Sequence, residues 1–148
     1  MESRWRSCMH RAVIVVFSVC VAGLLISGCS AGADVARVEG EIAGFRQLVI
    51  ADKFHEIYSA SANDLRNTTS EKDFTDLLSA VKRKLGPLQS SQQLNWQTMS
   101  VNGNSTIKIV FKSQYTGGDA TEQFTYKFDG QSYLLAGYNI NSNALIIK

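Results

Sequence analysis

The chain has 148 residues, with 15 Lys and Arg, 13 Asp and Glu, and three cysteines. Three of the arginines and Glu2 precede Cys29, so residues 29–148 carry 12 basic and 12 acidic side chains. A neutral segment whose longest basic run is residues 82–84 lacks the electrostatic footprint of a nucleic-acid-binding protein. Cys29 is the only cysteine of that segment, which excludes an internal disulfide and a cysteine-based metal site there. Its length suits one domain.

Residues 1–28 have the three-part layout of a secretory signal peptide. Three arginines precede an uncharged apolar run over residues 12–25, and the small residues Ser27 and Gly28 follow. The run falls short of the roughly 20 apolar residues of a transmembrane helix and is followed by no stop-transfer charges. Translation from Met9 would leave a shorter but usable basic region, so both start sites stay open. We therefore predict an exported protein whose leader is removed.

The leader ends in Leu25-Ile26-Ser27-Gly28-Cys29, which resembles the lipobox of bacterial lipoproteins. This resemblance implies cleavage between Gly28 and Cys29, acylation of Cys29 with chains such as palmitate, and anchoring to membrane lipid in the cell envelope. Two or more acyl chains anchor stably, at about 0.8 kcal/mol per buried methylene. Ser30 resembles the pattern that sorts lipoproteins of Gram-negative bacteria to the periplasmic face of the outer membrane. The alternative is a secreted protein without lipid.

Residues 29–34 follow as the lipidated N-terminus and a tether. Their small and polar composition predicts a flexible segment, and five residues reach at most about 17 Å when extended. The single domain is then expected over residues 35–148, close to the membrane surface.

Two helices are predicted at the start of the domain. The first begins near Val35, because apolar residues recur at helical spacing: Val38, Ile42, Phe45 and Val49. Gly40 and Gly44 either weaken this helix or permit the close approach of another element. The second runs from Asp52, a candidate N-cap, to about Ser61.

The third predicted helix carries the clearest local signals. Ser70 and Asp73 form a capping-box-like start, and an apolar stripe follows at Phe74, Leu77, Leu78, Val81 and Leu85. Acidic residues lie in its early turns and basic residues 82–84 in its last turn, as the helix dipole favours. Gly86-Pro87 ends it. Residues 82–84 are therefore interpreted as a solvated helix end rather than a binding patch.

After Pro87 the apolar period becomes two. Four strands are predicted, separated by turns at Asn102-Gly103, residues 116–119 and Asp129-Gly130, and residues 144–147 extend the last strand or pair at the edge. Leu94 and Trp96 are out of phase with Met99 and Val101, which predicts a β-bulge. The fold class is therefore α+β, with N-terminal helices packed on a four-stranded antiparallel meander.

The same order of elements resembles a family of small exported bacterial proteins of unknown function. The segments that carry the resemblance are residues 52–58, 74–87, 120–122 and 136–140. Ser91-Gln92 stands where the family pattern has Ser-Arg, so any role of that arginine is absent here. The resemblance implies a cystatin-like or nuclear-transport-factor-two-like cone, a curved sheet around a long helix. Such folds serve transport factors, isomerases and inhibitors, so fold alone does not assign function.

The domain offers few catalytic candidates. His55 is its only imidazole, and although Asp52 and Glu56 are near it in sequence, one histidine makes neither a usual metal site nor a marked triad. We expect His55 to be a solvent-side residue. The cone interior has candidates for ligand binding or acid/base chemistry in Glu122 and several tyrosines, namely Tyr58, Tyr115, Tyr126 and Tyr138. Tyr126 and Tyr138 fall on apolar strand phases and are expected in the core with satisfied hydroxyls.

These observations predict a membrane-anchored, non-enzymatic interaction module that binds an envelope protein and requires no cofactor, metal or nucleic acid. The alternative is a small-ligand carrier or an isomerase-like enzyme that uses the cone interior. A cavity of about 300 Å³ or more with polar groups such as Glu122 or Tyr58 favours the alternative. Filling of the cone by phenylalanines opposes it, the residues in question being Phe45, Phe74, Phe111 and Phe124. A broad exposed apolar patch favours a protein partner.

Overall fold

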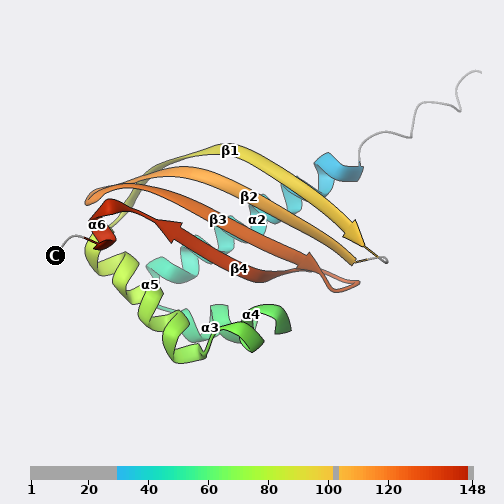
Figure 1. Ribbon diagram of the computed structural model, residues 1–148, viewed down its shortest axis with the longest axis horizontal. Helices are drawn as coiled ribbons and strands as arrows, with labels where there is room; N and C mark the ends of the chain where they lie inside the picture. Colours follow the sequence, from blue (N-terminus) through green and yellow to red (C-terminus); the bar gives the residue numbers. More distant parts are fainter. Residues whose placement is uncertain (1–29, 102–103, 147–148) are drawn as a thin grey trace, which may run out of the picture. The chain divides into compact units, whose positions relative to one another are not determined.

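The computed structural model describes residues 30–101 and 104–146. The predicted lipobox with Gly28 and Cys29, and the turn at Asn102-Gly103, lie outside these residues. Figure 1 shows helices packed on one curved sheet and a short helix near the C-terminal end. In chain order these are α2 (Ser30–Ile50), α3 (Phe54–Ser59), α4 (Asn63–Thr68), α5 (Glu71–Leu85), β1 (Leu88–Val101), β2 (Asn104–Tyr115), β3 (Gly118–Phe128), β4 (Tyr133–Asn141) and α6 (Asn143–Ile146).

The sheet is an antiparallel meander in the order β1-β2-β3-β4, and helices lie along its concave side (Figure 1). This confirms the predicted α+β class. The pairing of β1 with β2 shifts register between Gln93 and Asn95, which is the bulge that the phase change in the sequence predicted. Within residues 30–101 and 104–146, no helix combines the length and the apolar character needed to span a membrane.

Helix α2 begins earlier than the sequence pattern predicted. Residues 30–34 are its first turns rather than a flexible tether. In helical form five residues rise about 7.5 Å, less than half their extended reach. Gly40 and Gly44 do not serve close packing either, because a Cβ atom at each would meet nothing within 4 Å. Val38 and Ile42, on the opposite side of the helix, are buried in the core.

The segments after α2 and after β4 differ from the prediction in three places. Asp52 does not cap a helix: it has a positive φ of 59° and precedes Lys53, the N-cap of α3. Helix α4 was not predicted. It follows Ala62, whose N–H donates to the carbonyl of Leu135 in β4 at 2.9 Å. The prediction that residues 144–147 extend the last strand or pair at the edge is wrong for residues 144–146, since Asn143–Ile146 is helical, and residue 147 lies outside the described residues.

Helix α5 confirms its predicted boundaries. Ser70 Oγ accepts a hydrogen bond from the Asp73 N–H at 3.1 Å, and Gly86 takes the left-handed φ of 70°. The turn between β2 and β3 packs against the end of this helix, where the Gly117 N–H donates to the Leu85 carbonyl at 2.8 Å. A Cβ on Gly117 would lie 2.6 Å from a backbone oxygen of α5, so glycine is required there.

The core lies between α2, α5 and the concave face of the sheet. At its centre the ring of Phe124 lies 5.3 Å from that of Phe45, 6.0 Å from Phe111 and 5.0 Å from Tyr138, measured between ring centroids. Tilted and edge-on arrangements at these separations are favourable for aromatic rings.

Candidate functional site

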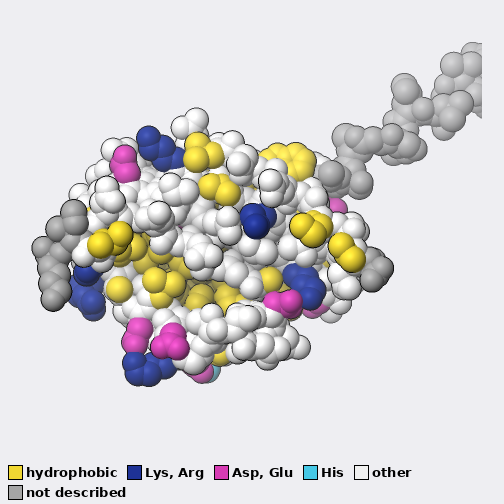
Figure 2. All heavy atoms as spheres, viewed as in Figure 1, with side chains coloured by type: hydrophobic (Ala, Val, Ile, Leu, Met, Phe, Trp, Pro, Cys, Tyr) yellow, Lys and Arg dark blue, Asp and Glu magenta, His cyan; other side chains and the backbone are white. Residues whose placement is uncertain are grey.

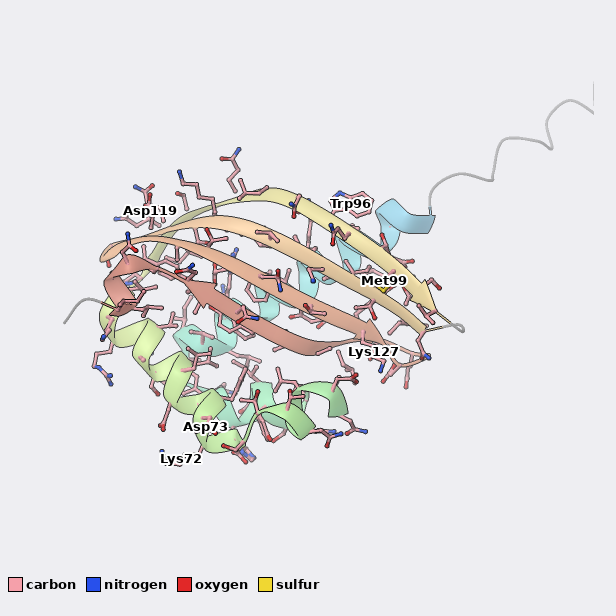
Figure 3. The ribbon with its side chains drawn as sticks, viewed as in Figure 1. Lys72, Asp73, Trp96, Met99, Asp119 and Lys127 are labelled. Atoms are coloured by element: carbon pink, nitrogen blue, oxygen red, sulfur yellow. The ribbon has the colours of Figure 1, made fainter. Side chains whose placement is uncertain are left out.

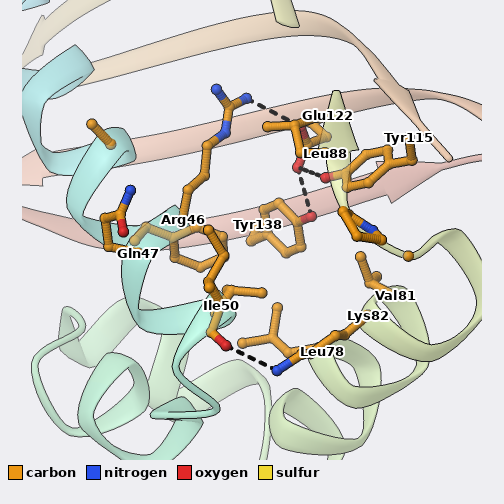
Figure 4. Close-up of a pocket in the computed structure, with 15 residues that line it drawn as sticks. Arg46, Gln47, Ile50, Leu78, Val81, Lys82, Leu88, Tyr115, Glu122 and Tyr138 are labelled. Carbon is orange, nitrogen blue, oxygen red and sulfur yellow. Dashed lines mark hydrogen bonds and ion pairs between the residues drawn. The ribbon is translucent and has the colours of Figure 1, made fainter. Parts of the chain in front are cut away.

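A pocket of about 560 Å³ adjoins the core at the end where α5 leads into β1 (Figure 4). Its walls are mostly apolar and come from α2, α5 and the start of β1: Phe45, Val49, Ile50, Leu78, Val81 and Leu88. Arg46, Lys82 and a polar cluster on the sheet complete the lining. Both the volume and the apolar character fall within the usual range for small-molecule sites.

Glu122 is the centre of the polar cluster, although its side chain is only 1% exposed. Its Oε1 accepts hydrogen bonds from the hydroxyls of Tyr115 at 3.0 Å and Tyr138 at 2.9 Å. Its Oε2 accepts from Ser113 Oγ and from Arg46 Nη2, the latter at 3.2 Å. A carboxylate has about four acceptor positions, so these four donors occupy all of them.

The register of the sheet brings these donors together. Glu122 lies on the same face of β3 as the buried residues Ala120 and Phe124, in a position that the strand pattern reserves for apolar side chains. Ser113 pairs with Ala120, and Tyr138 pairs with Phe124, so both are diagonal neighbours of Glu122 on that face. A buried carboxylate needs such partners, because its desolvation is costly unless it is paired and hydrogen-bonded.

Arg46 reaches the cluster from α2. Its Nη2 also donates to Ser91 Oγ at 2.9 Å, and its guanidinium lies 4.9 Å from the ring centroid of Phe111. The side chain is 22% exposed, while its Nε is buried without a hydrogen-bond partner. Ser91 in turn contacts Ser113, with 3.0 Å between their hydroxyl oxygens. Arg46 therefore joins α2 to β1 and β3 by direct polar contacts.

The tyrosine hydroxyls of the cluster are held in their protonated form. Burial, followed by the charge of Glu122, raises the pKa of Tyr115 and of Tyr138 above the ordinary value of 10.0. At neutral pH both hydroxyls therefore act as hydrogen-bond donors to Glu122.

Of the five candidates named from the sequence, the structure brings together Glu122, Tyr115 and Tyr138. Tyr126 is buried in the core and does not line the pocket, and its pKa is also raised, chiefly by burial. Tyr58 lies among the helices, where its hydroxyl donates to the carbonyls of Thr69 at 3.0 Å and Arg66 at 3.4 Å. Tyr58 therefore fixes the loop after α4 and does not belong to the site.

Arg46 and Ser113 were missed by the sequence reasoning. Arg46 occupies a polar position in the helical pattern of α2, and nothing local marks it as a partner for β3. The usable signal was Glu122 itself, because an acidic residue on an apolar strand phase requires a cation and further donors nearby.

His55 is exposed, as predicted, but its carboxylate partner is neither Asp52 nor Glu56. Its Nδ1 contacts Glu71 Oε1 at the start of α5. This hydrogen bond and the charge of Glu71 raise the pKa of His55 above 6.5. In the part of the chain that the structure describes, no group of three or more potential metal ligands occurs.

Two observations decide for or against the ligand site considered from the sequence, a cavity of about 300 Å³ or more and a cone filled by phenylalanines, and the structure shows both. All four phenylalanines are buried, namely Phe45, Phe74, Phe111 and Phe124. They fill the middle of the core, yet the pocket beside them exceeds 300 Å³ and contains Glu122. The structure thus meets the volume criterion for the ligand alternative in a pocket beside a core that the phenylalanines fill.

A family model described as "Protein of unknown function (DUF4019)" matches residues 44–138, more than half of the chain. The match covers the C-terminal part of α2, α3 to α5 and most of the sheet, and so includes every residue of the polar cluster. A comparison with curated proteins gave no match.

Proposed function

We propose a function on the premise that the chain belongs to the DUF4019 family of proteins of unknown function. In this proposal the chain is a lipoprotein of the bacterial cell envelope, anchored through acylated Cys29. Its domain has the cystatin-like or nuclear-transport-factor-two-like cone and binds a small, mostly apolar ligand in the pocket. The single observation that carries the ligand role is an apolar pocket of about 560 Å³ with one polar cluster.

The lining suggests the shape of the ligand. Val49, Ile50 and Val81 offer an apolar wall, and removal of apolar surface from water supplies the driving force, at about 25 cal/mol per Å². Arg46 and Tyr115 lie at the polar side of the pocket. A molecule with an apolar body and one polar end matches this division.

The contacts of Glu122 support binding rather than acid/base chemistry. A general base needs a free lone pair within hydrogen-bond reach of the proton that it removes. All acceptor positions of Glu122 are used by protein donors. The raised pKa of Tyr115 and of Tyr138 keeps both hydroxyls protonated at neutral pH, so neither is available to accept a proton as a general base. We therefore also propose that the domain is non-catalytic.

The ligand role is tested with the neutral apolar fluorophore N-phenylnaphthylamine. The full chain is placed in lipid nanodiscs, and the signal of protein-free nanodiscs is subtracted. Ala43 is exposed on α2 and lines the pocket, so Ala43→Trp fills the pocket without removing a core side chain. Ala36→Trp, also at an exposed position of α2, is the matched control.

Saturable binding to the wild type and to Ala36→Trp is expected, with a loss of about tenfold in affinity for Ala43→Trp, which corresponds to about 1.4 kcal/mol. Equal binding by the two tryptophan variants, or no saturable binding to the wild type, would refute the ligand role.

The anchor is tested separately with Cys29→Ala. Cells labelled with radioactive palmitate should yield a labelled wild-type protein in the membrane fraction and an unlabelled variant. Label on the Cys29→Ala protein would contradict acylation at this position.

A further inference from the structure

Exposed apolar side chains concentrate on one stretch of the edge strand β1. Of the six large apolar side chains that are exposed in the described residues, four lie within eight residues of this strand. We call them the β1 apolar surface: Leu94 at 55% exposure, Trp96 at 44%, Met99 at 66% and Val101 at 57%. Figure 2 shows separate hydrophobic side chains exposed at the end of the molecule where β1 ends, besides others along the middle of the same face.

The β1 apolar surface covers both sides of the strand. Trp96 pairs with the buried Ile109 and therefore faces the concave side of the sheet, since directly paired residues share a face. Met99 pairs with Thr106 and faces the convex side. An edge that is apolar on both sides suits insertion into an apolar medium better than packing on a flat protein face.

This surface lies at the same end of the domain as the N-terminal turns of α2. The bond from Arg46 to Ser91 ties the later part of α2 to the start of β1. From this bond, α2 runs toward its N-terminus and β1 runs toward its C-terminus, and both reach the same end of the domain (Figure 1). They extend about 24 Å and about 33 Å respectively, from their rises per residue. Figure 3 shows Trp96 and Met99 at that end.

The charges of this region also suit a lipid surface. Residues 88–115, which include β1 and β2, contain no Asp or Glu. They carry Lys108, which pairs with Gln97 and so shares the convex face with Met99, and Lys112. Anionic phospholipids attract such lysines, and tryptophan favours the membrane interface.

We propose that the β1 apolar surface docks onto the bilayer that holds the acylated N-terminus. The inference rests on the proposed acylation of Cys29. Helix α2 begins at Ser30, the residue that follows Cys29 in the sequence, so the proposal places the N-terminal turns of α2 close to the lipid. The β1 apolar surface, at the same end, then meets the headgroups and upper acyl chains.

Tryptophan fluorescence tests the docking directly, because Trp96 is the only tryptophan after Cys29. The acylated protein, made from a precursor with Trp5→Phe so that an uncleaved leader adds no tryptophan, is reconstituted into vesicles of phosphatidylethanolamine and phosphatidylglycerol whose acyl chains carry bromine. Quenching of Trp96 and a blue shift of its emission are expected. The matched control is Ile146→Trp in a Trp96→Phe background, since Ile146 is exposed on α6 at the far end of the sheet (Figure 1).

The outcomes separate docking from anchoring. A chain that does not float with the vesicles overturns both the acylation and the docking. A chain that floats while Trp96 is not quenched more than the control overturns the docking alone. Docking alone is also overturned if Trp96 is shielded from water without being quenched and the domain crosslinks to a protein, including a second copy of this chain. Met99→Asp, which places a carboxylate against phosphatidylglycerol, should weaken docking about fivefold, and an unchanged quenching curve contradicts the proposal.

Discussion

The pair formed by Arg46 and Glu122 permits a quantitative test of the polar cluster. Arg46→Met keeps an unbranched side chain of similar reach but removes the charge, and Glu122→Gln keeps the shape of the carboxylate while removing its charge. With each variant alone, one charge of the pair stays in the pocket without its partner. Arg46→Met combined with Glu122→Gln removes both.

The exposure of the two residues decides which single change costs more. Glu122 is 1% exposed, so without Arg46 its carboxylate stays buried with only neutral donors, and we expect a loss of about 4 kcal/mol in the free energy of unfolding. Arg46 is 22% exposed and can regain water when Glu122 becomes glutamine. The loss of charged hydrogen bonds then costs about 2.5 kcal/mol. The double variant should lose about 4.5 kcal/mol, less than the sum of the two by about 2 kcal/mol.

Urea denaturation of the three variants and the wild type, followed by circular dichroism, measures these values. Losses of this size leave a domain of ordinary stability folded in water, so each transition is measurable. Additivity within about 0.5 kcal/mol, or a larger loss from Glu122→Gln than from Arg46→Met, would refute the assigned pairing.

Three further outcomes follow from local geometry. Burial raises the pKa of Tyr138 in the folded protein, so its contribution to the free energy of unfolding is fully present below a pH of about 10 and is lost as the pH rises further. In urea titrations at several pH values, Tyr138→Phe should make this fall shallower by about 1.4 kcal/mol per pH unit. The same slope in the variant and the wild type would contradict this. In NMR titrations Glu71→Gln should lower the pKa of His55 toward 6.5, and an unchanged pKa would exclude the assigned contact. Thermal denaturation should show Gly40→Ala stabilising by up to about 1 kcal/mol and Gly117→Ala destabilising, and the reverse order would refute the packing.

The predictable parts of the fold are those that local chemistry determines. Helix α5 has its own start and stop in Ser70 and Gly86, and the strands follow from alternation and turn residues. Helix α4 has six residues, too few for apolar side chains to recur visibly at helical spacing. It is connected to the sheet through the backbone of Ala62, the residue that precedes it. Long-range contacts of this kind leave no mark in a local pattern.

The same distinction applies to the candidate site. Glu122 could be found because a carboxylate occupies an apolar strand phase. Its partnership with Arg46 depends on where α2 crosses the sheet, 76 residues away in sequence. Tyr58 and Tyr138 are alike as residue types, and only packing places one among the helices and the other beside Glu122.

The contacts of Glu122 also bear on how the three strands find their pairing. A shift of β3 by one residue against its neighbours would turn the Glu122 side chain to the convex face, away from Ser113 and Tyr138. Such a misaligned sheet would leave Arg46 without its counter-ion. The cluster thus favours the native strand alignment over alignments shifted by one residue during folding. Apolar side chains of similar size would discriminate less sharply between these alignments.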